Sequence, residues 1–196
     1  WGREELGLTY PAEIEVLRMV TERLEEAEIP YMLSGSMALS FYGRPRMTRD
    51  IDIVVELSSD DVDRIVRLFE KDFYIDADMV RKAVACRGMF NIIHYDAVVK
   101  IDFIVRKDTP YRATEFARRK RVKIGIFDVW IVKPEDLVLS KLEWAKASRS
   151  EIQIQDIKNL LDSLHGQIDM EYLRYWAEEL AVDAFLEEIL GERHSS

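Results

Sequence analysis

The sequence has little of the residue types that hold structural metals or covalent cross-links. Among its 196 residues there are three histidines and one cysteine, Cys86. A single cysteine cannot form an internal disulfide or a cysteine-based zinc site, and the histidines lack metal-ligand spacing. We therefore expect neither disulfides nor structural zinc, and we expect Cys86 to be a small buried thiol.

Long apolar runs are also missing. No segment approaches the roughly 20 consecutive apolar residues of a membrane-spanning helix. The first residues lack the basic segment followed by an apolar one that marks a signal peptide. Since 48% of the residues are nonetheless hydrophobic, the sequence predicts a soluble globular protein with a real core, located in the cytoplasm and without a membrane partner.

The chain is short of positive charge. Its formal net charge is −9, which argues against broad, nonspecific binding of nucleic acid, because such binding needs many cations to neutralise phosphates. Local basic clusters occur at Arg44, Arg46 and Arg49 and at residues 118–123, "RRKRVK". Runs of charge are usually solvated faces, but this composition leaves room for a small basic site.

Regular patterns of apolar residues are plentiful. Helical spacing predicts helices over residues 11–28, 36–43, 60–72, 78–86, 110–119, 134–147, 151–164, 169–179 and 182–190. Alternating and β-branched runs predict strands over residues 31–35, 50–57, 89–95, 97–105, 121–125 and 127–132. The predicted fold class is α+β, a mixed sheet with helices over residues 1–133 followed by a C-terminal helical bundle over residues 134–196.

Two acids stand at the start of one predicted strand, "DIDIVVEL" at residues 50–57. Residues two apart on a strand point to the same side, so Asp50 and Asp52 share one face while Ile51 and Ile53 take the other. Asp is a poor strand former and like charges repel, so the pair costs stability unless a cation or ligand lies between the carboxylates. Carboxylate oxygens are the ligands that Mg²⁺ prefers, and two such ions stabilise a phosphoryl displacement.

A third acid, Asp102, interrupts the otherwise mostly apolar run "VVKIDFIV". If its strand lies beside that of Asp50 and Asp52, the three carboxylates form one metal cluster. The alternative is that Asp102 pairs with Lys100 on its own face, or with a nearby arginine. As the third member of a set, Asp102 favours the metal-site interpretation.

Gly35 and Ser36 lie where a predicted strand gives way to a helix. A glycine there lets the backbone approach a ligand closely, and free helix N–H groups with a hydroxyl suit phosphate. The alternative is an ordinary turn with a helix cap, so the pair gains weight only together with the acids.

The ordered set of these motifs resembles the DNA polymerase β-like nucleotidyltransferase superfamily. The matching residues are Leu33-Ser34-Gly35-Ser36, then thirteen residues, then Asp50-Ile51-Asp52-Ile53, and later Ile101-Asp102-Phe103. The resemblance covers residues 31–105 and implies a mixed sheet on which Asp50 and Asp52 bind metal ions.

In that resemblance, Asp102 completes the cluster and helps to activate the acceptor hydroxyl, while Gly35 and Ser36 hold the triphosphate. The implied reaction transfers a nucleoside monophosphate from an NTP, with pyrophosphate leaving and Mg²⁺, or alternatively Mn²⁺, as cofactor. Arg49, directly before Asp50, is a further candidate for contact with the nucleotide phosphates, and Thr48 lies close enough to hydrogen-bond nearby.

Residues 134–161 resemble the helical segment of bacterial nucleotidyltransferase-like proteins related to the toxins of abortive-infection systems. The matching positions are Lys141, Ser150, Glu151, Gln153 and Asp156. The resemblance implies that Lys141 contacts the triphosphate as a point charge. Lys141 as a surface residue remains an alternative.

A purely structural interpretation of this helical segment is open as well. Ser150 with Gln153, or Ser148 with Glu151, fits a helix capping box, which we favour over substrate contact. Trp144, one turn beyond Lys141, is expected in the core, with stacking on a base as the alternative.

Three functional hypotheses follow. The first is a metal-dependent nucleotidyltransferase with an NTP donor and an unknown acceptor, such as RNA, a protein or a small molecule. The second is an inactive nucleotide- or partner-binding module of the same fold, and the third is the toxin of a toxin–antitoxin pair. The preferred base and the oligomeric state are not encoded in any motif.

Overall fold

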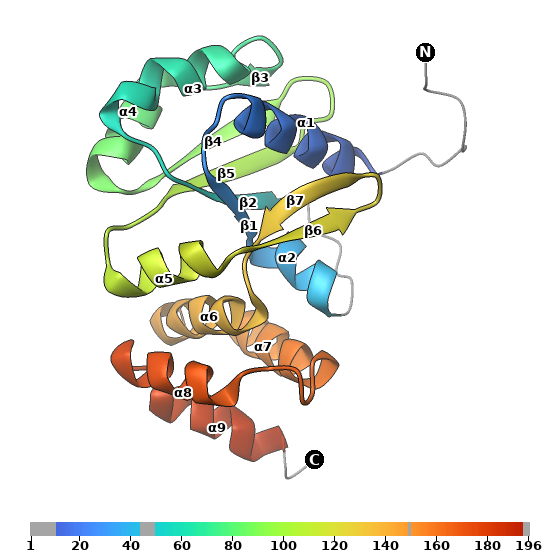
Figure 1. Cartoon of the computed structure of the whole chain (residues 1–196), viewed down its shortest axis with the longest axis vertical. Helices are drawn as coiled ribbons and strands as arrows, with labels where there is room; N and C mark the ends of the chain where they lie inside the picture. Colours follow the sequence, from blue (N-terminus) through green and yellow to red (C-terminus); the bar gives the residue numbers. More distant parts are fainter. Residues whose placement is uncertain (1–10, 44–49, 149, 194–196) are drawn as a thin grey trace.

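We analysed a computed structural model, which describes residues 11–43, 50–148 and 150–193 (Figure 1). Within these residues one mixed sheet has the strand order β3-β4-β5-β2-β1-β7-β6. The strands are β1 (Tyr31–Ser34), β2 (Asp50–Val55), β3 (Phe73–Tyr74), β4 (Met89–His94), β5 (Lys100–Val105), β6 (Lys120–Ile124) and β7 (Phe127–Ile131).

The helices cover both sides of the sheet and continue beyond it. They are α1 (Ala12–Glu26), α2 (Gly35–Tyr42), α3 (Val62–Phe69), α4 (Ala77–Cys86), α5 (Pro110–Arg118), α6 (Pro134–Ser148), α7 (Glu151–Ser163), α8 (Met170–Glu179) and α9 (Asp183–Arg193). Figure 1 shows α6 to α9 stacked below the sheet, on the side of α2. The helix α2 packs against α6 and α7, so the end of β1 lies close to the C-terminal helices.

The central strands run in both directions. β2 pairs parallel with β5 and antiparallel with β1, and β1 pairs parallel with β7. The hairpins β4–β5 and β6–β7 are antiparallel. Because β2 lies between β1 and β5, its exposed face lies between the start of α2 and β5, the strand that carries the third acid.

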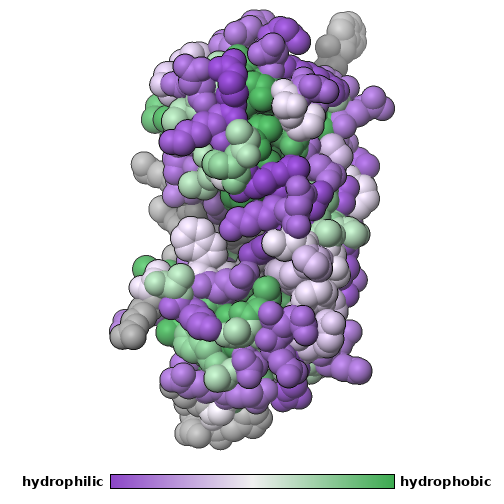
Figure 2. All heavy atoms as spheres, turned by 90° about the vertical axis from the view of Figure 1, so that its left-hand side faces the viewer, coloured by the Kyte–Doolittle hydropathy of each residue, from purple (hydrophilic) through white to green (hydrophobic). Residues whose placement is uncertain are grey.

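Packing against the core explains why buried and accessible residues alternate along β2. Ile51, Ile53 and Val55 are fully buried on one face, where apolar burial contributes about 2 kcal/mol per side chain. Asp50, Asp52 and Val54 occupy the opposite, more accessible face. Figure 2 shows one side of the molecule as largely hydrophilic, with apolar side chains gathered in an upper and a lower area.

The fold class and every helix and strand expected from the sequence are confirmed to within a few residues, and the structure adds the two-residue β3. The helix expected over residues 60–72 begins with a 3-10 turn at Ser59–Asp61, where Ser58 forms a capping box with Asp61, and α3 ends at Phe69. The division at residue 133 stays a prediction. The last described strand ends at Ile131.

Two observations concern the expected absences. Cys86 is exposed at the end of α4, so the expectation of a buried thiol is wrong; the helix turns that position toward solvent while Val80, Ala83 and Val84 face the core. In the part of the chain that the structure describes, none of the helices has the length and apolarity that crossing a bilayer requires.

Candidate active site

The pairing of β2 with β5 sets two of the predicted acids side by side. Asp52 lies opposite Asp102 in the parallel register, and Asp50 lies opposite Lys100. Neighbouring strands are about 4.8 Å apart, so the two aspartates on the same face of adjacent strands are close. The structure therefore brings Asp52 and Asp102 together, with Asp50 one step toward the beginning of β2.

Gly35 touches Asp52 and cannot be replaced there without a clash. Its φ is +62°, a left-handed conformation that glycine adopts without strain. A Cβ built on Gly35 would lie 1.9 Å from Oδ2 and 2.5 Å from Cγ of Asp52. The next residue, Ser36, donates a backbone N–H hydrogen bond to the Asp52 carboxylate. The strand-to-helix turn and Asp52 thus form one unit.

The electrostatic environment of Asp52 is unfavourable for a charge in the absence of a cation. Burial raises the pKa of its carboxyl, and the nearby carboxylates of Asp102 and Asp50 raise it further. The Ser36 N–H and the Lys141 ammonium act in the opposite direction but do not cancel the shift. A site that concentrates negative charge in this way is suited to a bound cation.

Asp102 pairs with Lys100, as one of the two interpretations of its sequence position predicted, and its role in a metal site stays a prediction. Its side chain is buried, with 7% of the residue exposed, and its Oδ2 accepts a hydrogen bond of 2.7 Å from Lys100 Nζ. This ion pair raises the pKa of Lys100. The other oxygen, Oδ1, is buried and has no hydrogen-bond partner within the described structure, so one acceptor remains available for a ligand.

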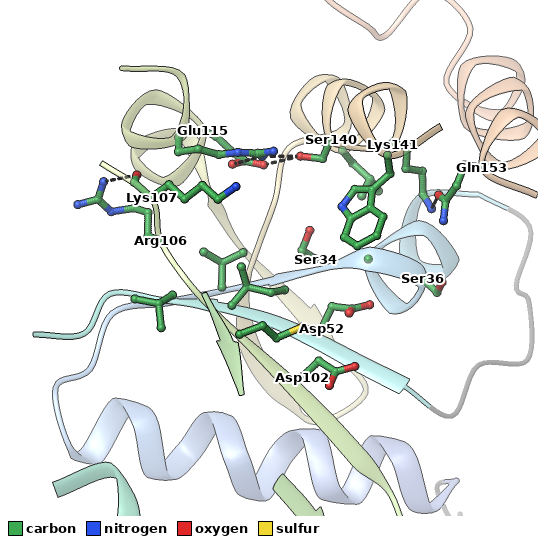
Figure 3. Close-up of a pocket in the computed structure, with 18 residues that line it drawn as sticks. Ser34, Ser36, Asp52, Asp102, Arg106, Lys107, Glu115, Ser140, Lys141 and Gln153 are labelled. Carbon is green, nitrogen blue, oxygen red and sulfur yellow. Dashed lines mark hydrogen bonds and ion pairs between the residues drawn. The ribbon is translucent and has the colours of Figure 1, made fainter. Parts of the chain in front are cut away.

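A cavity of about 380 Å³ opens above the two acids (Figure 3). Its walls come from β1, β2, β4, β5 and the helices α2, α5, α6 and α7. The lining residues are Ser34, Gly35, Ser36, Asp52, Val54, Met89, Asp102, Ile104, Val105, Arg106, Lys107, Arg112, Glu115, Leu137, Ser140, Lys141, Trp144 and Gln153. Asp50 is exposed and does not line it.

Lys141 of α6 lies in the wall of this cavity rather than on the surface, so the surface alternative is wrong. Only 5% of the residue is exposed, and its Nζ donates to Gln153 Oε1 and to Asp156 Oδ2, both at 2.9 Å. Both partners belong to α7. The acceptors hold the ammonium in a fixed place beside the carboxylates of the sheet.

The capping interpretation of this segment is wrong in its details. Ser150 occupies the N-cap position of α7 but makes no side-chain capping bond. The Gln153 side chain turns toward Lys141 instead, and the Ser148 hydroxyl donates to the carbonyl of Trp144 within α6. Trp144 itself is 66% exposed at the cavity, so its expected place in the core is also wrong.

Two of the predicted site residues lie outside the part of the chain that the structure describes, and one group of cavity residues was not predicted from the sequence. Arg49 and Thr48 lie outside the described residues. No sequence pattern pointed to a buried cluster in the cavity roof, in which the Ser140 hydroxyl donates to Glu115 at 2.9 Å and Arg112 donates to both. Burial raises the pKa of Glu115 despite its bonds to Arg112 and Ser140. Only tertiary packing brings α5 and α6 together in this way.

The residues present fit a hard divalent cation in two respects. Asp52 and Asp102 supply carboxylate oxygens on adjacent strands, and Asp102 Oδ1 is buried without a hydrogen bond in the described structure. Across residues 11–43, 50–148 and 150–193, however, no three His, Cys, Asp or Glu side chains are grouped closely enough to hold a metal. The three-carboxylate cluster therefore stays a prediction, and the fit rests on two acids.

The mixed sheet and its helices have a nucleotidyltransferase-like fold. Residues 11–189 match the model of a family described as nucleotidyltransferase of unknown function (DUF6036), so the chain belongs to this family. The superfamily resemblance drawn from the motifs is thereby confirmed. Comparison with curated proteins found no match.

Solved structures agree on the fold. A nucleotidyltransferase-like antigenic protein from Paracoccidioides brasiliensis is similar at 15% identity and a TM-score of 0.54, over 91% of this chain and 92% of that one. The antibiotic-resistance factor ANT(2″)-Ia, in complex with adenylyl-2″-tobramycin, is similar at 15% identity and a TM-score of 0.57, over 86% and 98%.

The lincosamide antibiotic adenylyltransferase LnuA, bound to lincomycin, is similar at 13% identity and a TM-score of 0.51, over 78% of this chain and 98% of that one. At these identities the likeness concerns the fold.

Proposed function

We propose that this protein is a metal-dependent nucleotidyltransferase that transfers a nucleoside monophosphate from an NTP to an acceptor and releases pyrophosphate. The observation that carries the proposal is the contact between the Gly35-Ser36 turn and Asp52, with Asp102 beside it in register, at the base of a cavity. Family membership and the fold support a transferase of this kind.

The donor's phosphates fit the end of the cavity near α2. Gly35 allows close backbone approach, Ser36 adds a hydroxyl at the first turn of the helix, and Lys141 supplies a fixed positive charge. These groups would bind the triphosphate so that the acceptor hydroxyl can attack its α-phosphate and pyrophosphate can leave.

Asp52 and Asp102 would hold Mg²⁺ or Mn²⁺, with Asp50 as a further ligand from the start of β2. When bound, the metal would neutralise charge on the phosphates and stabilise the attacking and leaving oxygens. Asp102 Oδ1, which has no hydrogen-bond partner within the described structure, would accept the proton of an acceptor hydroxyl while Lys100 stays bonded to Oδ2.

The named neighbours guide the choice of donor. LnuA is an adenylyltransferase, and ANT(2″)-Ia is in complex with adenylyl-2″-tobramycin. We therefore propose ATP as the first donor to test, and their antibiotics as first trial acceptors only.

The test is transfer of label. The protein is incubated with each α-labelled NTP, Mg²⁺ or Mn²⁺, and cell extract, beside two variants. We expect label in an acceptor with the wild type and with Asp96→Ala, which changes an exposed turn carboxylate, and none with Asp52→Ala. If no label transfers beyond the level of Asp52→Ala, catalysis of this reaction is excluded.

A second candidate has one specific observation in its favour. The Lys100–Asp102 ion pair neutralises the third acid, as expected of a nucleotide-binding module without turnover. In that case nucleotide binding would persist with unchanged affinity after chelation of metal, and no product would form. Metal-dependent binding that strengthens in Lys100→Met would instead favour catalysis. The toxin hypothesis stays a prediction, tested by toxicity on expression that is lost in Asp50→Ala.

A further inference from the structure

The cavity extends well past the carboxylates along an apolar floor. On the same strand faces, the residues after Asp52 and Asp102 are Val54 and Ile104, which lie opposite one another. Met89 of β4 lies opposite Ile104 on the other side and is 54% exposed. All three line the cavity, so a ligand that reaches beyond the acids meets a shelf without hydrogen-bonding side chains.

The strand order separates the two ends of the reaction. The Gly35-Ser36 turn follows β1, and the strands then run β1, β2, β5, β4 across the sheet. Asp52 is therefore the acid beside the proposed donor phosphates, whereas Asp102 and Met89 lie one and two strands further away. A molecule attacking from the side opposite to the triphosphate would therefore lie on the shelf formed by Ile104 and Met89.

Among the described residues, four cationic side chains line this cavity, and three of them are already paired within the protein. Arg106 forms ion pairs with Glu56 and Asp108. Arg112 bonds Glu115 and Glu143, and Lys141 bonds Asp156. Their charges are compensated by neighbouring carboxylates.

Lys107 is the exception. It is exposed, and no hydrogen bond or ion pair of its ammonium occurs in the described structure. Figure 3 shows its side chain extending into the cavity, while the Arg106 guanidinium turns away and bonds the Lys107 carbonyl oxygen. An exposed ammonium that has no partner among the described residues and lies at the edge of an apolar shelf can pair with an anion.

We infer that the acceptor is a small molecule with an anionic group, a carboxylate or a phosphate, that pairs with Lys107. Its apolar or aromatic part lies on Met89 and Ile104, and its reacting hydroxyl reaches Asp102. This inference rests on the proposed transfer reaction and names its acceptor class. Lys107 follows Asp102 by five residues, a span of at most about 17 Å, which a molecule of moderate size bridges.

A polynucleotide acceptor fits these observations less well. Nucleic-acid binding requires many free cations, and four of the five basic residues in the run 118–123 make contacts within the protein. Arg118 bonds Glu135 and Asp136, Arg119 lies over Phe116 and Trp130, Lys120 lies over Tyr42, and Arg121 bonds Glu25. The described cavity offers one free cation.

Binding is tested with a probe, so that turnover is not needed. Naphthoate, naphthyl phosphate and uncharged naphthol are titrated into protein with isotope-labelled methionine methyl groups, and the Met89 signal is assigned with Met89→Leu. The titrations are run with and without α,β-methylene-ATP and Mg²⁺. The variants are Lys107→Met, which keeps the aliphatic stem, and Lys82→Met, an exposed lysine on α4 remote from the cavity lining.

We expect at least one anionic probe to shift the Met89 signal, both with and without the ATP analogue, and naphthol to bind more weakly. Lys107→Met should weaken the anion by about fivefold, the size of one exposed ion pair, and Lys82→Met should not. The carboxylate and phosphate arms show which anion is preferred.

Several results would overturn the inference: equal affinity in Lys107→Met, equal binding of naphthol, or displacement of the probe by the ATP analogue, which would assign the shelf to the donor. Displacement by a short single-stranded RNA with steep salt dependence would assign it to a polynucleotide. Since none of these readouts requires label transfer, they are independent of whether the proposed reaction is found.

Discussion

At the scale of single residues, Gly35 is a position where even one added methyl group would clash with its neighbour. Alanine there would adopt a strained φ and drive its Cβ into Asp52. We expect Gly35→Ala to lower the free energy of unfolding by about 2–4 kcal/mol, from left-handed strain and overpacking together, and to abolish nucleotide binding. Urea denaturation and calorimetric titration with ATP measure the two effects.

Gly166 provides a matched control for this substitution. It has a φ of +75°, but a Cβ added there would meet only open space, so Gly166→Ala carries the backbone strain without the clash. We expect it to cost about 1 kcal/mol and to leave nucleotide binding intact. Equal losses in both variants would show that contact with Asp52 is not the reason for glycine at position 35.

We expect the charged Asp52 carboxylate to lower the stability of the folded protein. Its pKa in the folded protein is raised above the ordinary value of 3.8 by burial, Asp102 and Asp50. Between these two values the folded state binds more protons than the unfolded state, so its contribution to stability falls as pH rises through this window. At pH 7 and without metal, Asp52→Asn should therefore stabilise the protein by about 1 kcal/mol, a gain that disappears below about pH 3.8.

Thermal unfolding across pH measures this gain, and Asp96→Asn, in an exposed turn, should change stability by less than about 0.5 kcal/mol. Adding Mg²⁺ should raise the melting temperature of the wild type more than that of Asp52→Asn. A variant that is less stable than the wild type at neutral pH would contradict the assigned electrostatic strain.

At the scale of elements, the ion pair of Lys141 joins α6 to α7. Lys141 and Asp156 are 5% and 4% exposed, and removing one charge leaves the other buried with one partner fewer. We expect Lys141→Met to destabilise by about 2–4 kcal/mol. The double variant Lys141→Met/Asp156→Leu should recover most of this loss but not nucleotide binding. A double-mutant cycle with additive effects would show that the pair does not couple the two helices.

At the scale of the whole molecule, a second buried network connects α5 to the C-terminal helices α6 and α8. Arg118 of α5 bonds Asp136 of α6 at 3.1 Å and lies 3.6 Å from the ring centre of Tyr172 in α8. The Tyr172 hydroxyl donates to Asp136 Oδ1 at 2.6 Å. Three helices from distant parts of the chain meet at one fully buried carboxylate.

The corresponding test compares two tyrosines on one helix. Tyr172→Phe removes a hydrogen bond to buried Asp136 and should lower the free energy of unfolding by about 1–3 kcal/mol. Tyr175→Phe changes a tyrosine that is 56% exposed and should have little effect. Hydrogen exchange of α8 should rise in Tyr172→Phe alone; the same exchange rates in both variants would rule out a docking role for the network.

The local features of this protein were open to prediction because they depend on neighbours in the chain. The two-residue period of "DIDIVV" placed Asp50 and Asp52 on one face, and the hairpin of β4 and β5 followed from two apolar runs separated by little more than Asp96. The misfit of Asp102 in an apolar strand likewise marked it before its partner was known.

By itself, the sequence determined the elements, the motif residues and the class of the fold, since periodicity and turn chemistry are local. Only the tertiary structure decided that Asp52 and Asp102 are paired in register, that Lys141 is buried against Asp156, and that Trp144 and Lys107 face the cavity. These outcomes depend on which strands and helices become neighbours. Burial and charge compensation between segments far apart in the chain are set by that packing, and no local pattern encodes them.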